Sequence, residues 1–154
     1  MHDIAILATS AVALAKVQSI HDAIAAQPQI NLETQHVLHA GTYARTIKVP
    51  AGVVLAGVFI KIPTLLILDG VLSILIGDEW HMMIGRNVLP AGAGRKQAFA
   101  ASSESHITMI FATNARTVAE AEAEFTDQTE MLMSRKPGAF NEIIGGPSGC
   151  LEQP

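Results

Sequence analysis

Short runs of apolar residues, separated by turn-forming residues, recur along most of the chain and predict a mainly β protein. Residues 42–49 alternate between apolar and polar side chains, which is typical of a strand with one wet face. Residues 53–83 hold successive apolar runs, separated by Pro63, by Asp69-Gly70 and by a turn at residues 77–79. We interpret this stretch as the central hairpins of a β-sandwich, one of which turns at Asp69-Gly70.

A helix is expected near each end of this β region. Apolar residues recur at three- and four-residue steps over residues 3–26, and Pro28 ends that pattern. A short acidic helix is expected over residues 117–125, with Thr117 as its N-cap and Glu120 completing a capping box. We therefore predict an antiparallel jelly roll with three parts: an N-terminal helical segment (1–30), a jelly-roll domain (31–126) and an extended C-terminal arm (127–154).

The strands at residues 65–68 and 71–76 are apolar at nearly every position, so both of their faces should be dry. Either the N-terminal helix or the C-terminal tail covers the outer face, or this face is a subunit interface. The sequence leaves both alternatives open. The interface hypothesis, extended to the apolar anchors of the C-terminal arm, names Leu65, Ile67, Leu72, Ile74, Ile76, Met131, Phe140 and Ile143.

Composition favours contacts with other subunits over contacts with nucleic acid or membrane. Hydrophobic residues make up 49% of the 154 residues and charged residues only 16%, which leaves little charge to cover a surface. A net charge of −4 argues against nucleic-acid binding. The apolar run at residues 4–15 is shorter than the roughly 20 residues of a membrane span and lacks a positive start. We expect synthesis in the cytoplasm, where the lone Cys150 is an unreactive tail thiol.

Four motifs in residues 39–127 resemble those of small single-domain cupins, of the kind often encoded by tailed phages: YARTIKVPAGVVLAGVFIK, the Asp69-Gly70 turn, VLPAGAGRKQAFA and SHITMIFATNARTVAEAEAEF. The resemblance implies a cupin-like jelly roll, in which a His pair, a Glu and a later His hold a metal ion. The corresponding positions here are Ile60, Pro63 and Thr64, and the later strand offers Arg95, Lys96 and Gln97. The resemblance therefore implies a barrel that has lost its metal site.

The remaining polar residues give no stronger pattern. His36, His39, His81 and His106, with Glu79 or Glu104, form a displaced metal site only if the fold brings them together, and their spacing is unspecific. Scattered surface histidines are the simpler interpretation. The glutamates of residues 117–125 and the basic pair at residues 95–96 are interpreted as solvated faces. We predict no catalytic residue and no cofactor.

Three functions remain open at this stage. The first is a non-catalytic structural protein that assembles with copies of itself, in one form a decoration protein bound to the major capsid protein of a phage virion. The second is a metal-dependent cupin enzyme with displaced ligands. The third is a metal-free barrel that binds a small apolar ligand in a cavity lined by Ile60, Leu66 and Met109.

Overall fold

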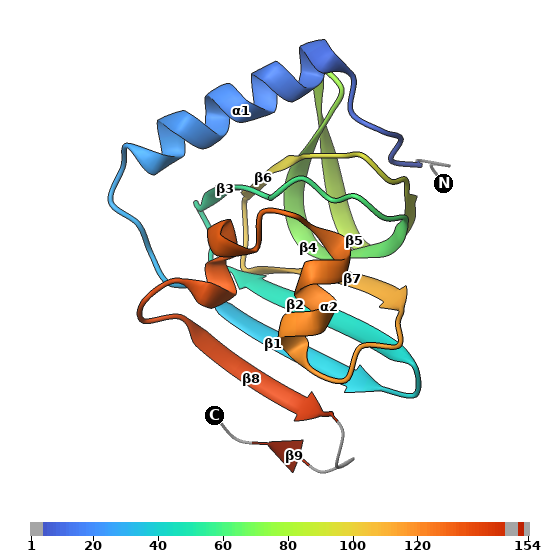
Figure 1. Ribbon diagram of the computed structural model, residues 1–154. Coiled ribbons are helices and arrows are strands. Elements are labelled where there is room, and N and C mark those ends of the chain that lie inside the picture. The colour runs from blue at the N-terminus through green and yellow to red at the C-terminus, as the bar shows by residue number, and fades with distance from the viewer. Residues whose placement is uncertain (1–4, 147–150, 153–154) are drawn as a thin grey trace.

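A computed structural model of the protein describes residues 5–146 and the backbone of residues 151–152 (Figure 1). Nine strands form one sheet in the order β3-β6-β4-β7-β2-β1-β8-β9, and β5 pairs with β4 beside this path. The strands are β1 (Glu33–His39), β2 (Thr42–Val49), β3 (Val54–Ala56), β4 (Thr64–Ile76), β5 (Glu79–Ala91), β6 (Ala98–Ala101), β7 (Ser105–Ala112), β8 (Phe140–Gly145) and β9 (Leu151–Glu152).

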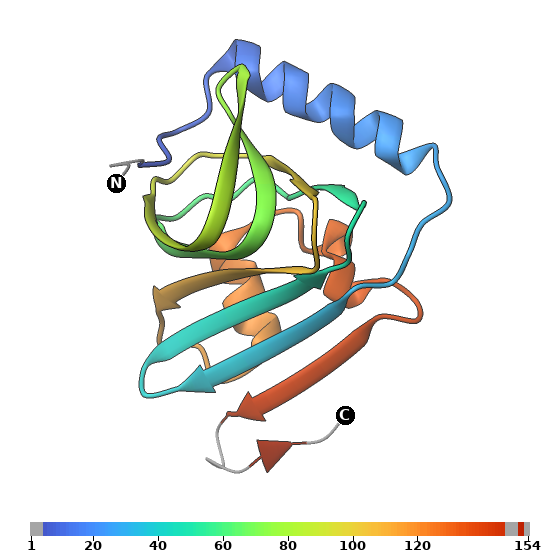
Figure 2. The same cartoon turned by 180° about the vertical axis from the view of Figure 1, so that it is seen from behind.

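The predicted fold class is confirmed: the chain is mainly β, with a helix before the sheet and a short helix after most of it. The strands form a single sheet that curls on itself, in place of two separate layers (Figures 1 and 2). Most pairs are antiparallel, as in β1–β2, β2–β7 and β4–β7, whereas β1–β8 is parallel. The curl gives the sheet an inner face, which holds the core.

The hairpin predicted at Asp69-Gly70 is wrong, because β4 runs without interruption through both residues. The chain reverses instead at residues 77–78, between β4 and β5. Gly70 has a φ of 134° and lies so close to β7 that a Cβ there would collide with Ser105. It pairs with Gly85 of β5, whose φ of 78° is also positive. The glycine therefore permits a bend and a close strand contact in place of a turn.

The N-terminal helix α1 (Ala11–Ala25) is shorter than predicted. It begins after Ser10, whose hydroxyl accepts a hydrogen bond from the backbone N–H of Ala13 at 3.1 Å. Residues 5–9 run along the barrel, where Ile6 bridges to Ala91, and Asp3 lies outside the described residues. The helix also contacts the tip of the β4–β5 hairpin, because Lys16 Nζ lies 2.7 Å from Asp78 Oδ1 (Figure 2).

Helix α1 covers one part of the outer face of β4. Val17 packs with Leu75 of β4 and Ala98 of β6, and all three are buried. Farther along the same face, Leu65 is exposed and Ile67 is half-buried. The sequence left two alternatives for the outer face of β4: a covering helix or an uncovered surface. Both occur, because α1 covers one end of the strand and leaves the other end exposed.

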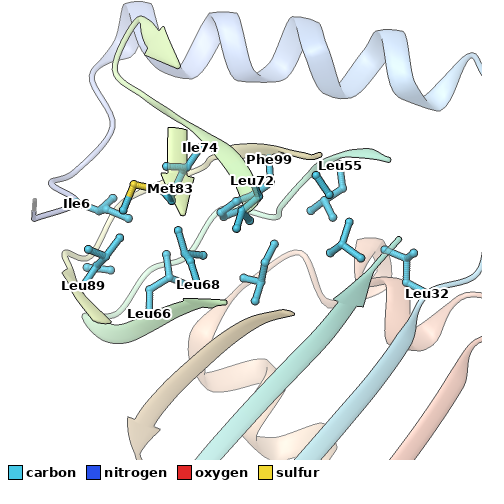
Figure 3. Packing of buried hydrophobic residues seen from close by; sticks show 14 residues of the cluster. Ile6, Leu32, Leu55, Leu66, Leu68, Leu72, Ile74, Met83, Leu89 and Phe99 are labelled. Carbon is cyan, nitrogen blue, oxygen red and sulfur yellow. The ribbon is translucent and has the colours of Figure 1, made fainter. Parts of the chain in front are cut away.

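The inner face of the sheet holds the main core (Figure 3). Leu72 and Ile74 are at most 1% exposed there, so their assignment to a subunit interface is wrong. The reason is strand alternation: both lie on the inward face of β4, opposite the outward Ser73 and Leu75. The core also contains Ile6, Leu32, Val49, Leu55, Leu66, Leu68, Met83, Leu89, Ala91, Phe99, Ala101 and Ile107.

The second helix, α2 (Val118–Phe125), has the predicted cap: Thr117 Oγ1 accepts from the N–H of Glu120 at 3.2 Å. Two 3-10 turns, η1 (Thr129–Met131) and η2 (Met133–Arg135), follow it before β8 joins the sheet beside β1. Residues 127–146 thus lie on their own domain, and Cys150 lies outside the described residues. No helix in the described part of the chain is long and apolar enough to cross a membrane.

Candidate ligand-binding site in the barrel interior

A largely apolar cavity of about 110 Å³ lies inside the curled sheet. The three residues expected to line such a pocket, Ile60, Leu66 and Met109, all line it. Strand alternation explains their position, because Leu66 on β4 and Met109 on β7 are paired residues and therefore share one face. The wall is completed by Ile47, Leu55, Ala56, Gly57, Val58, Phe99, Ile107, Phe125, Met131, Leu132 and Met133, and by three polar residues, Arg45, Arg95 and Gln97.

Arg95 is a buried cation in the wall of this cavity, with only 2% of its surface exposed. Its Nη1 donates to the backbone oxygens of Gly92 and Ile62 at 2.7 and 3.3 Å, and its Nη2 donates to Thr64 Oγ1 at 2.6 Å. Among the described residues, no carboxylate forms an ion pair with it. Burial lowers the pKa of Arg95 to about 10, so the guanidinium stays charged at neutral pH.

The interpretation of residues 95–96 as a solvated basic edge is therefore wrong. Arg95 bridges to Ile60 and turns inward, and Lys96 is buried under α1, where its Nζ lies 2.9 Å from His21 Nδ1. Burial is the largest cause that lowers the pKa of Lys96. The small residues at positions 91–94 suggested a surface loop that leaves residues 95–96 exposed to solvent. In the structure, the curled sheet covers Arg95 and α1 covers Lys96.

The positions that correspond to cupin metal ligands do not fit a metal ion. Ile60 has no donor atom, and Pro63 is exposed. The hydroxyl of Thr64 accepts a hydrogen bond from Arg95, so a cationic side chain already lies at this point. A divalent ion needs imidazole nitrogens or carboxylate oxygens that converge on it, and a guanidinium would repel it.

The four candidate histidines are not brought together. His36 is buried on β1 and His39 is exposed at the end of the same strand. His81 lies on β5 opposite Ile74, whereas His106 lies on β7 between Lys48 and Asp69. Over residues 5–146, no group of three or more His, Cys, Asp or Glu side chains could hold a metal ion. Glu79 and Glu104 are both exposed.

A buried ion pair, which the sequence did not suggest, forms the polar wall beside the cavity. Arg45 on β2 and Glu122 on α2 are at most 5% exposed, and Arg45 Nη1 donates to Glu122 Oε2 at 2.9 Å. Ser134 and Arg135 of η2 donate to the same carboxylate at 2.6 and 2.8 Å. Burial alone would raise the pKa of Glu122, but these hydrogen bonds and the charges of Arg45 and Arg135 outweigh it and lower the pKa. Glu122 is therefore not part of a solvated face.

His36 extends this wall through a chain of hydrogen bonds. Asn141 donates to the backbone oxygen of Ser134 at 2.9 Å, so its Oδ1 accepts from His36 Nε2 at 2.8 Å. The other ring nitrogen, Nδ1, then accepts from the Tyr43 hydroxyl at 2.6 Å. Burial lowers the pKa of His36 and raises the pKa of Tyr43 to about 12, so both are neutral near pH 7. This histidine ties β8 to β1 and β2.

The chain is similar to several solved cupin structures. These include a cupin superfamily protein from Desulfitobacterium hafniense (15% identity, 57% of this chain and 83% of that chain, TM-score 0.45). A cupin-2 domain containing protein from Shewanella frigidimarina is 15% identical over 60% of this chain and 91% of that chain, with a TM-score of 0.43. A salicylate 1,2-dioxygenase from Pseudaminobacter salicylatoxidans is 12% identical over 75% of this chain and 35% of that chain, with a TM-score of 0.46. No family model matches the chain, and no curated protein matches its sequence.

Proposed function

We propose that this protein binds a small, largely apolar molecule inside its barrel, and that it does so without a metal ion. The observation that carries the proposal is the cavity of about 110 Å³ with its mostly apolar wall. An apolar cavity of about 150 Å³ is large enough to bind benzene. The cavity here is about a quarter smaller, so it suits a short alkyl chain. Small-molecule sites are commonly apolar with a few placed polar groups, and this wall has that composition.

The ion pair of Arg45 and Glu122 supports a preformed site. Ser134 and Arg135 bond to Glu122, and these bonds hold the η1–η2 segment against the barrel. The same segment contributes Met131, Leu132 and Met133 to the cavity wall. Fixed polar contacts thus position an adaptable methionine-containing wall, and methionine side chains adjust readily to ligand shape.

Binding of pentan-1-ol, followed by methyl-detected NMR, tests this proposal. We expect the methyl resonances of Ile60, Leu66 and Met109 to shift in a saturable way. The cavity-filling variant Ile60→Trp should lose these shifts at Leu66 and Met109. The matched variant Ile84→Trp, at a residue that is 72% exposed on β5, should keep them. The proposal is contradicted if the wild-type methyls stay unmoved, or if the shifts persist when the cavity is filled.

We propose self-association as a second function, because an exposed apolar face supports it. Trp80, Met82, Ile84 and Val88 alternate along the outer face of β5 and are 43–72% exposed. Among the described residues, β4 is the only named strand that pairs with β5. Ile6 bridges the other edge of β5 only at its end, at Ala91, so the rest of that edge is available for a second copy. Two residues of the predicted interface extend this face through their partners on β5: Leu65 pairs with Pro90 and Ile67 with Val88.

The rest of the predicted interface set is distributed differently. Phe140 on β8 is 67% exposed, and Ile76, Met131 and Ile143 are half-buried. Their role in a subunit contact stays a prediction, with the outer face of β5 as the better supported surface. A narrower form of this proposal is that the protein decorates a virion. A decoration protein must also bind assembled capsids, and co-sedimentation measures this binding.

Light scattering over a range of concentrations tests self-association. The wild-type protein should show a mass above that of the monomer, and Ile84→Lys should move it toward the monomer. Val12→Lys, at an 81% exposed position on α1, is the matched control and should leave the mass unchanged. A wild-type monomer at every concentration would remove this second function.

A further inference from the structure

We infer that the ligand of the barrel carries a carboxylate, and that Arg95 binds this group. The inference rests on the proposed binding function and names its ligand class: short-chain monocarboxylates. The two arginines of the cavity wall differ in how their charges are balanced. Arg45 faces Glu122 at 2.9 Å, so its charge is balanced within the protein. Arg95 lines the same cavity with no such partner among residues 5–146.

The hydrogen bonds of Arg95 leave its charge uncompensated. All three of them go to neutral acceptors: two backbone oxygens and the Thr64 hydroxyl. A guanidinium has five N–H groups, so these three hydrogen bonds leave two of its N–H groups available to a ligand. Buried charges in proteins are usually paired, because an isolated ion loses its hydration without replacement. An anion in the cavity would supply the missing partner.

The shape and size of the site favour a carboxylate over other anions. A planar guanidinium matches a carboxylate through two parallel hydrogen bonds. The cavity wall holds one cation without an anionic partner. A carboxylate, with a single negative charge, balances this cation better than a phosphate group, which is nearly doubly charged. The rest of the wall is apolar, with Ile60, Leu66 and Met109 available to contact a hydrocarbon portion. Gln97, only 7% exposed, adds an amide to the same wall.

Affinity measurements with three five-carbon probes test this inference by calorimetry and methyl NMR. We expect pentanoate to bind the wild-type protein at least about tenfold more tightly than pentan-1-ol, and pentylamine to bind more weakly than either. Arg95→Met should abolish the preference for pentanoate while keeping pentan-1-ol binding. Arg95→Lys keeps the charge and should keep part of the preference. Arg86→Met, at an exposed arginine of β5, is the control and should change nothing.

The outcomes separate this inference from the function on which it rests. Equal affinity of the wild-type protein for pentanoate and pentan-1-ol overturns the role of Arg95 and leaves apolar binding in place. Absence of binding by every five-carbon probe overturns both. Tighter binding of inorganic phosphate than of pentanoate contradicts the carboxylate class. If circular dichroism finds Arg95→Met unfolded, the wild-type comparison and Arg95→Lys decide the question.

Discussion

Glu122 is the residue on which the polar wall of the barrel depends, because it receives hydrogen bonds from three partners. Arg45, Ser134 and Arg135 all donate to its carboxylate, and only 3% of its surface is exposed. Breaking a buried ion pair from one side is costly, since the remaining charge stays buried without a partner. This residue connects α2, the strand β2 and the turn η2.

The variant Glu122→Gln should therefore lose about 3–5 kcal/mol of unfolding free energy near pH 7. The glutamine preserves most of the shape of the side chain and removes the charge that balances Arg45. Urea denaturation followed by circular dichroism measures the difference. Glu130→Gln, at an exposed residue of η1, should stay within about 0.5 kcal/mol of the wild-type protein. Equal losses in the two variants would contradict the role of the ion pair.

The same carboxylate makes stability depend on pH. The pKa of Glu122 in the folded protein is lower than its ordinary value of 4.5, so its stabilisation is complete above that value. The stabilisation is lost as pH falls from 4.5 through the lower pKa of the folded state. We expect the stability difference between wild-type protein and Glu122→Gln to shrink as pH is lowered over this range. Urea titrations at a series of pH values measure it, and a constant difference would contradict the lowered pKa.

The sequence predicted the side of the strand on which Tyr43 and Arg45 lie, but it did not predict the burial of Glu122. Alternation placed Tyr43 and Arg45 on one face of their strand, and the structure buries both. In α2, however, the acidic composition suggests a solvated helix, although its three glutamates lie two residues apart and therefore point to different sides of the helix. The buried stripe is Ala121, Glu122 and Phe125, whose spacing of one, three and four residues is that of a helix face. Only the docking of this face against the barrel decides that one glutamate points inward.

At the scale of elements, the bend in β4 accounts for the curl of the sheet. Gly70 and Gly85 are paired on β4 and β5, and both have positive φ. On either side of the bend, β4 pairs with different strands: residues 65–69 with β7, and residues 72–74 with β6. One long strand thus belongs to both halves of the barrel, and the bend permits this.

Replacement of these two glycines by alanine should have unequal effects. Gly85→Ala meets no atom within 4 Å, so it adds only the strain of positive φ, about 1–2 kcal/mol. Gly70→Ala adds a collision with Ser105 to comparable strain, and should cost about 1–3 kcal/mol more. Thermal and urea unfolding of both variants measure the difference. Equal losses would show that β7 does not constrain the bend.

Sequence patterns predicted the elements better than their connections. Alternation and apolar runs located strands at residues 42–49, 65–68 and 71–76, which lie in β2 and β4. The Asp-Gly pair misled because positive φ serves a hairpin turn and a strand bend equally well. The start of α1 shifted for a similar reason: residues 5–9 are apolar enough for a helix, but Ile6 N donates to Pro90 O at 2.8 Å and holds them beside the barrel. Tertiary contacts decide both cases.

For the whole molecule, the alternation of apolar residues and the spacing of turns were enough to predict the fold class. They were not enough to predict whether the barrel contains a cavity. Whether a barrel is filled or hollow depends on how side chains from distant strands meet. The sequence showed that Ile60 and Thr64 replace expected ligands, and the structure adds that Arg95 bonds to Thr64 within the cavity wall. Arg95 is buried because the curled sheet and the η1–η2 segment enclose the cavity whose wall it helps to form.

A crystal structure of the protein soaked with 5-bromopentanoate tests carboxylate binding in the barrel. We expect an anomalous bromine peak inside the barrel, near Ile60, Leu66 and Met109. We also expect both carboxylate oxygens within hydrogen-bond distance of the Arg95 guanidinium, at roughly 2.7–2.9 Å. An empty barrel, or a ligand bound with its carboxylate directed away from Arg95, would contradict carboxylate binding by Arg95.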